Sequence, residues 1–289
     1  MPRSVHGIHH VTCIAGDPQE NLDFYAGVLG MRLVKRSVNQ DVPDTYHLFY
    51  ADGAGTPGSD LTFFPWPHLP PGRPGVGLAV EVSLAVPAGS LEFWHDRLTR
   101  HGVPCGEGET RFGEPVLPLR DPHGLPLALV ATDEPGEFVP WDSSPVPVEH
   151  QIRRIHSVRL WERDLEPTQQ LLTSLLGFRL LAEEGSWRRY GVDGGGSGKL
   201  VDVAVRKDKP RGRWGVGAIH HVAWRTRDTE EELALRLDLA RAGLPSSELI
   251  DRFWFKSVYF HEPGGVLFEL ATDGPGFARD EEPDHLGER

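Results

Sequence analysis

The feature that most constrains the fold of this chain is a pattern of segments that occurs four times. Each copy starts with a β-prone run, continues with a helical segment followed by a glycine, and ends in further short β-prone runs. LGMRL at 29–33 matches LGFRL at 176–180, and HGVP at 101–104 matches AGLP at 242–245. Because the repeat is long, we interpret it as duplication of a compact unit and not as a solenoid.

The copies predict where helices and strands lie. In the first copy, Asp17 and Pro18 provide a helix cap and a first helical residue, and Gly30 follows the helix. The predicted strands of this copy are 8–14, 31–36, 47–50 and 61–64. The later copies begin with predicted strands at 80–86, 155–161 and 219–226, continue with predicted helices at 90–100, 167–176 and 230–242, and end with predicted strands at 125–130, 200–205 and 266–270.

This order predicts an α+β fold in which four βαβββ modules pair into two domains of curved mixed sheets. A Pro-rich joint at 135–147 separates the second copy from the third. We therefore expect an N-terminal domain, 1–146, and a C-terminal domain, 147–289. Each would hold two modules, and the acidic tail would belong to the second domain.

Composition excludes several classes of function. The formal net charge of -12 argues against nucleic acid or an anionic membrane as a partner, since both require a basic surface. No apolar run approaches the roughly 18 residues of a membrane helix, and the first residues lack a signal-peptide core. Cys13 and Cys105 are too few for a disulfide framework, so we expect a cytoplasmic protein. Nothing in the sequence fixes whether it forms a homo-oligomer.

One carboxylate stands out in the segment from Asp251 to Asp273. A Glu-Pro-Gly-Gly sequence at 262–265 predicts a hairpin turn, and the apolar strand after it carries a single charge, Glu269. A charge in such a strand costs several kcal/mol unless it is paired or ligates a metal. We interpret Glu269 as a metal ligand.

Comparing the copies with one another identifies partners for this carboxylate. Histidine pairs occur at the start of the first and fourth copies only, as His9-His10 and His220-His221. At the last strand, the fourth copy alone carries a glutamate. One histidine from each pair and Glu269 would form a two-His, one-carboxylate set, which leaves metal positions open and is typical of non-haem Fe(II) oxygenases. The other histidine of each pair should face away or lie at the edge of the site, because strand side chains alternate.

Other interpretations of these residues stay open. Glu269 could pair with an arginine, and Asp202 could be a rival ligand, although its module has Ser157 where a histidine is needed. We expect Glu81 to pair with a neighbouring basic group. His47 and His156 are interpreted as core or structural residues, and Cys13 as a small buried hydrophobe.

Several motifs together resemble the vicinal oxygen chelate superfamily, and within it the ring-cleaving dioxygenases that open hydroquinones. The resemblance covers nearly the whole chain up to the acidic tail after Phe277. It rests on the segments HHVT at 9–12, YHLFYAD at 46–52, GTPG at 55–58, TRFG at 110–113, the second histidine pair, and the stretch from 251 to 269.

The resemblance implies Fe(II) held by His10, His221 and Glu269, with Mn as an open alternative. The choice of the second histidine of each pair as the ligand rests on this resemblance alone. It also implies that Arg252 holds an anionic oxygen and that Tyr259 contacts a substrate hydroxyl. Thr12, His9 and His220 would support the ligands. Either His220 or His9 would also act as acid or base. The substrates would be O2 and a small hydroquinone-like or catechol-like aromatic.

Two other functions are compatible with such a fold. A glyoxalase-type isomerase or lyase normally needs a second carboxylate ligand, at a position where this chain has Thr62. A metal-free protein that binds small molecules such as drugs would not need two histidine pairs. For an aromatic substrate, Trp66, Trp254 and Phe255 are candidate walls, although each could equally be a core residue.

Overall fold

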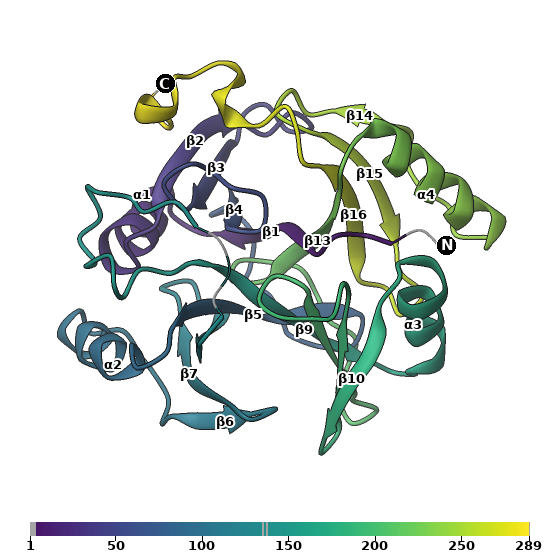
Figure 1. The fold of residues 1–289 in the computed structure, drawn as a ribbon, viewed down its shortest axis with the longest axis horizontal. Helices are drawn as coiled ribbons and strands as arrows, with labels where there is room; N and C mark the ends of the chain where they lie inside the picture. The colour runs from purple at the N-terminus through teal and green to yellow at the C-terminus, as the bar shows by residue number, and fades with distance from the viewer. Residues whose placement is uncertain (1–3, 135, 137, 289) are drawn as a thin grey trace.

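Two eight-stranded mixed sheets, each curled into half of a barrel, form the framework of the protein (Figure 1). The computed structural model describes residues 4–134, 136 and 138–288. Residues 135 and 137 of the predicted Pro-rich joint lie outside the described residues. Within the described part of the chain, no helix combines the length and the apolar character needed to cross a membrane.

The elements follow the predicted modules. The first module contains β1 (Ile8–Ala15), α1 (Pro18–Leu22), the π-helical turn η1 (Asp23–Val28), β2 (Arg32–Val38), β3 (Tyr46–Ala51) and β4 (Asp60–Pro65). The second contains β5 (Leu78–Pro87), α2 (Leu91–Arg100), β6 (Glu109–Arg111), β7 (Glu114–Arg120) and β8 (Pro126–Thr132). The third contains β9 (Arg154–Glu162), α3 (Glu166–Gln170), η2 (Leu171–Leu175), β10 (Arg179–Glu184), β11 (Trp187–Gly191) and β12 (Leu200–Val205). The fourth contains β13 (Ile219–Thr226), α4 (Thr229–Arg241), β14 (Ile250–Asp251), β15 (Lys256–His261) and β16 (Leu267–Thr272), followed by the short 3-10 helices η3 (Phe277–Arg279) and η4 (Pro283–His285).

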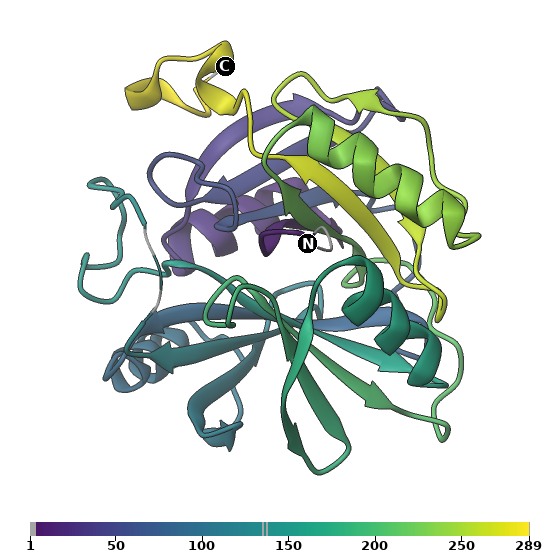
Figure 2. The same cartoon turned by 45° about the vertical axis from the view of Figure 1, so that its right-hand side comes forward.

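Each sheet takes one module from each half of the sequence. The first sheet runs β14-β15-β16-β13-β1-β4-β3-β2, so it joins the fourth module to the first through antiparallel β1 and β13. The second runs β10-β11-β12-β9-β5-β8-β7-β6 and joins the third to the second through antiparallel β5 and β9. Figure 2 shows the two sheets as separate layers. The halves 1–146 and 147–289 are therefore each continuous in sequence, but neither half forms a sheet by itself, because each contributes strands to both sheets.

The first helical segment begins as predicted but is not a regular α-helix. The Asp17 carboxylate accepts hydrogen bonds from the backbone N–H groups of Gln19 (2.8 Å) and Glu20 (3.0 Å), and Pro18 is the first helical residue. After Leu22 the chain widens into the π-helical turn η1. The third module shows the same change from α3 to η2, so the repeat preserves this irregularity.

One large hydrophobic core is shared by both sheets and all four modules. Each module's helical segment adds a buried apolar side chain to it: Phe24, Trp94, Leu172 and Leu239. Burying side chains of this size stabilises the fold by about 1.5–3 kcal/mol each. A smaller cluster lies apart from this core and includes Phe49, Trp254 and Phe277.

The acidic tail packs on the first module. Its residues after β16 lie over β2 in Figure 1, where the Lys35 ammonium pairs with Asp280 (2.8 Å) and with Glu281. Arg32 donates to the backbone carbonyls of Pro283 and Asp284 (3.0 Å each). The tail therefore links the end of the chain to the module in which the chain begins.

Two buried carboxyl groups meet where the hairpin of β15 and β16 touches β9. Glu262, in the hairpin turn, accepts hydrogen bonds from the Thr168 hydroxyl (2.7 Å) and the Val266 N–H (2.9 Å). Burial, and then the neighbouring charge of Glu262, raises the pKa of Glu162 to about 9. A Cβ on Gly264 would lie 1.7 Å from the Glu162 carboxylate oxygen, so any larger residue in the turn would displace that carboxylate.

Replacing Glu162 by glutamine is expected to stabilise the protein more at pH 8 than at pH 5. The folded-state pKa lies above the ordinary value, so the wild type has its full stability only at low pH and loses it as pH rises toward 9. The glutamine of Glu162→Gln cannot ionise. The difference in free energy of unfolding between this variant and the wild type should therefore grow by about 1–3 kcal/mol from pH 5 to pH 8. Urea unfolding measures this margin. Exposed Glu107→Gln is the control, and an equal margin at both pH values would contradict the expectation.

Candidate metal centre

Three side chains from adjacent central strands converge in the first sheet. His10 lies on β1, His221 on β13 and Glu269 on β16. Glu269 Oε2 is 3.3 Å from His10 Nε2 and 2.9 Å from His221 Nε2, and the two Nε2 atoms are 3.4 Å apart. Their residues are 0–3 % exposed. Ligands on paired central strands are held rigidly, as a defined metal geometry requires.

β-Bulges explain why each histidine pair stays together. The pairing of β1 with β13 shifts register between Ile8 and His10 and again between Thr12 and Cys13, so His9 and His220 are the extra residues. At both bulges the two neighbouring imidazoles touch through their Nδ1 atoms, at 2.9 Å in the first pair and 2.8 Å in the second. Of the two placements expected for the neighbouring histidine, each one therefore lies against its ligand histidine at the edge of the site and does not face away, because a bulge interrupts strict alternation.

The hydrogen bonds of His9 fix which nitrogen of His10 is free. The Thr272 carbonyl can only accept, so His9 Nε2–H donates to it at 3.1 Å. Burial, and then the adjacent His10, lowers the pKa of His9 to about 3 and keeps it neutral. Neutral His9 then accepts at Nδ1 from His10 Nδ1–H, which leaves the Nε2 lone pair of His10 directed at Glu269.

Electrostatics favour an ionised carboxylate at this centre. Burial alone would raise the pKa of Glu269, but His10 and His221 hold it well below its ordinary value. Burial lowers the pKa of His221, and the pKa of His220 falls to about 3 through burial and then its neighbour His221. Neutral imidazole and carboxylate are the forms that bind metal ions.

The donor set fits a divalent metal ion. Glu269 Oε2 is buried and has no hydrogen-bond partner among the described residues, although two imidazole nitrogens face it. The other carboxylate oxygen accepts from the Ser257 hydroxyl, which orients the group. An unsatisfied buried carboxylate oxygen is costly, and a cation shared with both Nε2 atoms would satisfy it. These three residues could therefore hold a metal.

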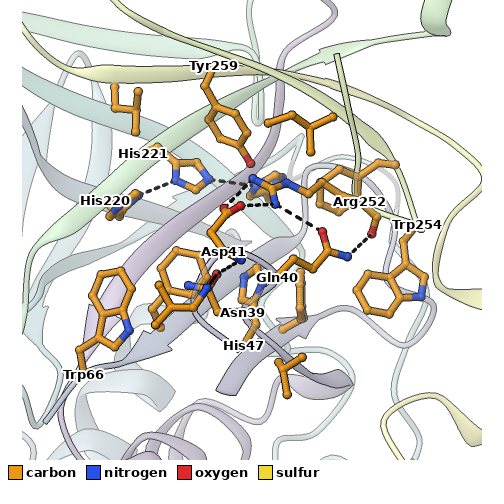
Figure 3. A pocket seen from close by; sticks show the side chains of 18 residues that line it. Asn39, Gln40, Asp41, His47, Trp66, His220, His221, Arg252, Trp254 and Tyr259 are labelled. Carbon is orange, nitrogen blue, oxygen red and sulfur yellow. Dashed lines mark hydrogen bonds and ion pairs between the residues drawn. The ribbon is translucent and has the colours of Figure 1, made fainter. Parts of the chain in front are cut away.

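A cavity of about 400 Å³ adjoins this centre (Figure 3). Its apolar walls are largely aromatic and include the three predicted wall residues, Trp66, Trp254 and Phe255. His10 and His221 line it, so the ligand atoms are accessible from the cavity. Its size and its mixture of aromatic walls with few polar groups are typical of small-molecule sites.

The structure separates the roles available to the other predicted residues. Arg252, Tyr259 and His220 line the cavity, whereas His9 and Thr12 are buried outside its lining. His220 stacks on Trp214 with ring centroids 4.4 Å apart. The predicted supporting residues thus divide into three that can reach a ligand and two that can only orient their neighbours.

Sequence reasoning missed part of the cavity. Asn39, Gln40 and Asp41, from the segment between β2 and β3, line it without belonging to any recognisable motif. His47, interpreted as structural, also lines it, and its Nε2 hydrogen-bonds the Thr62 hydroxyl (3.0 Å). Tyr46-His47 within the matched motifs was the available signal for that residue.

The rival ligands lie in the other sheet or are already paired. Asp202 accepts two hydrogen bonds from Arg189, at 2.8 and 3.0 Å. Glu81 pairs with Arg111, as expected for a carboxylate beside a basic group. His156 is buried and hydrogen-bonds Glu114 at 3.0 Å, in a structural role.

The fold and the site together define a class: a protein of paired βαβββ modules with a candidate metal centre inside one curved sheet. The chain belongs to the Glyoxalase/Bleomycin resistance protein/Dioxygenase superfamily, whose family model matches residues 7–129 and 154–270. The vicinal oxygen chelate resemblance is therefore confirmed.

Similar proteins extend this assignment. MhqO of Bacillus subtilis, named provisionally as a ring-cleaving dioxygenase, is 41% identical over 289 residues, covering 100% of this chain and 91% of MhqO. That alignment includes the acidic tail, which the family model does not reach. The chlorohydroquinone/hydroquinone 1,2-dioxygenase of Sphingobium indicum is 33% identical, covering 99% of this chain and 91% of the enzyme.

Two solved structures show the same fold. A crystal structure of a provisionally assigned dioxygenase from B. subtilis superposes with a TM-score of 0.95 at 40% identity, covering 99% of this chain and 91% of that one. Glyoxalase I of Zea mays gives a TM-score of 0.67 at 17% identity, covering 92% of each chain, and supports the fold alone.

Proposed function

We propose that this protein is an iron(II)-dependent dioxygenase that uses O2 to cleave the ring of a hydroquinone-like or catechol-like aromatic next to a hydroxyl group. The observation that carries the proposal is the convergence of three buried ligand atoms beside an aromatic-walled cavity of about 400 Å³. The relatives support the reaction, because MhqO is named for ring cleavage and the S. indicum enzyme for chlorohydroquinone and hydroquinone.

In this proposal His10, His221 and Glu269 would hold the metal. Two neutral imidazoles and one carboxylate are the ligand set of non-haem Fe(II) oxygenases, and Mn(II) is compatible with the same donors. When bound, iron would supply the redox chemistry that lets dioxygen react with an electron-rich ring. His9 and Thr12 are positioning residues: His9 fixes the tautomer of His10, and the Thr12 hydroxyl bonds that of Thr62 at 2.8 Å.

Three cavity residues would handle the substrate. The Arg252 guanidinium, 5.3 Å from the Tyr259 ring centroid, would bind the developing negative charge of a hydroxyl oxygen. The Tyr259 hydroxyl would hydrogen-bond the same substrate group. His220 lines the cavity while its Nδ1 contacts His221, so it, and not His9, would exchange a proton with the substrate.

The isomerase alternative has less support from the residues. Its second carboxylate would stand at Thr62, whose hydroxyl is engaged by Thr12 and His47. The likeness to glyoxalase I of Z. mays concerns the fold only. The apolar cavity beside the three candidate ligands favours a reaction that admits a ring and a small gas molecule together.

We also propose how the chain is organised and where it acts. The units 1–146 and 147–289 would be the products of the duplication, with His10 from the first and His221 and Glu269 from the second. The two separate family-model matches support this division. The low cysteine content supports a reducing cytoplasm as the compartment.

The test is oxygen uptake after anaerobic metal loading. Protein loaded with Fe(II) should consume about one O2 per hydroquinone or catechol molecule, whereas protein loaded with Zn(II) should consume none. An oxygen electrode measures the uptake, and parallel Mn(II) loading tests the other metal. Protein that retains one iron per chain but consumes no O2 with any of these diols would overturn the proposal.

A further inference from the structure

A salt bridge crosses the mouth of the cavity from the first module to the fourth. Arg252 donates from Nη2 to Asp41 Oδ2 at 2.9 Å and from Nη1 to Asp41 Oδ1 at 3.2 Å (Figure 3). Gln40 adds to it: its side-chain oxygen accepts from Arg252 Nη1 and its side-chain nitrogen donates to the Arg252 carbonyl, both at 3.3 Å. A bidentate arginine–carboxylate pair is geometrically specific, so Asp41 determines where the guanidinium points.

The segment that carries Asp41 is shaped to present it. The buried Asn39 side-chain oxygen accepts hydrogen bonds from the backbone N–H groups of Asp41 (2.9 Å) and Val42 (3.2 Å), which folds the segment into a turn. The Asp41 side chain is 67% exposed and that of Arg252 only 14%. The arginine therefore belongs to the cavity wall, and the aspartate approaches it from the solvent side.

This pair sets the net charge that the cavity presents. Among the described residues lining the cavity, Arg252 is the one lysine or arginine and Asp41 the one aspartate or glutamate. Arg252 is always protonated, so without Asp41 the cavity would expose an uncompensated cation to its ligand. With Asp41 in place the wall is neutral, and Glu269 remains as the buried charge of the metal centre.

A charge count then distinguishes two classes of ligand. Glu269, Arg252 and Asp41 together carry one negative charge, and a divalent ion would bring the site to one positive charge. A single ionised hydroxyl cancels that charge. An aromatic carboxylate that also presented an ionised hydroxyl would leave a net negative charge in an apolar cavity, where unpaired charge is costly.

We infer that Asp41 is a specificity-determining residue: by neutralising Arg252 it makes the cavity select uncharged dihydroxy-aromatics and reject dihydroxy-aromatics that also carry a carboxylate. The inference rests on the proposed function for the identity of the substrate. The selectivity itself is a binding property of Arg252 and Asp41, and it can be measured without turnover.

The experiment compares two small aromatic probes, phenol and benzoate, which differ in charge. Their binding to anaerobic Fe(II)-loaded protein is followed by quenching of tryptophan fluorescence, since Trp66 and Trp254 line the cavity. In Asp41→Asn the benzoate Kd should fall by about tenfold or more, equivalent to about 1.4 kcal/mol, while the phenol Kd changes by less than about threefold. Asp44→Asn, in the same segment but absent from the cavity lining, should leave both Kd values as in the wild type.

A double variant connects the effect to Arg252. Asp41→Asn/Arg252→Gln should lose the gained benzoate affinity, because no unmasked guanidinium remains. An unchanged ratio of benzoate to phenol affinity in Asp41→Asn, or a gain that persists in the double variant, would overturn the inference. Because binding is read without catalysis, absence of O2 uptake would count against the proposed function and not against this selectivity.

Discussion

Replacing Glu269 by glutamine is expected to abolish metal retention and substrate-dependent oxygen uptake together. Glutamine keeps the size of the side chain and can still meet the Ser257 hydroxyl, but it removes the negative charge that faces two imidazole nitrogens. Losing a supporting contact to a ligand already costs about 10–100-fold in metal affinity, so losing the anionic ligand itself should cost more. Metal content after desalting and oxygen uptake measure the two losses.

Thermal unfolding provides a readout that does not depend on catalysis. A metal at 100 times its Kd stabilises the folded wild type by about 2.7 kcal/mol, and this increment should vanish in Glu269→Gln. Glu248→Gln is a matched control, because that carboxylate is exposed, pairs with Arg236 and does not line the cavity. A Glu269→Gln protein that binds one metal per chain with wild-type affinity would remove this residue from the metal centre.

The repeat made much of the fold, and the convergence of the candidate ligands, predictable from sequence. Because four copies can be aligned within one chain, strands such as 200–205 and 219–226 were predicted with the bounds that the structure has. The same comparison showed that only the first and fourth modules carry histidine pairs, and these two modules share a sheet. The convergence of His10, His221 and Glu269 follows from that shared sheet.

Which modules pair could not be predicted, since every module offers a similar first strand as a partner. The choice of β1 with β13 and β5 with β9 depends on packing across the whole molecule. The bulges at His9 and His220 were also hidden, because a bulge changes the backbone register without requiring a particular side chain. Asp41 was missed for a third reason: a polar residue in a connecting segment looks like ordinary solvated surface until the fold brings Arg252 to it.

The second sheet shows what occupies the equivalent of the candidate metal position when the two histidine ligands are absent. Asp202 pairs in register with Arg159 on β9, as Glu269 does with Ala223 on β13, so the two carboxylates are structural counterparts. In the second sheet the Arg189 guanidinium, 7% exposed, binds Asp202 through two nitrogens. A protein cation there satisfies the carboxylate that a metal could satisfy in the first sheet.

Arg189→Ala is therefore expected to destabilise the protein by about 3–5 kcal/mol, because it leaves the buried Asp202 carboxylate without its partner. Removing both charges in Arg189→Ala/Asp202→Ala should recover part of that loss, since no isolated charge then stays buried. Arg206→Ala is the control: its pair with Asp208 lies at the surface and should contribute far less. Urea unfolding compares the three variants. If Arg189→Ala cost no more than Arg206→Ala, the guanidinium would not be what satisfies the Asp202 carboxylate in the second sheet.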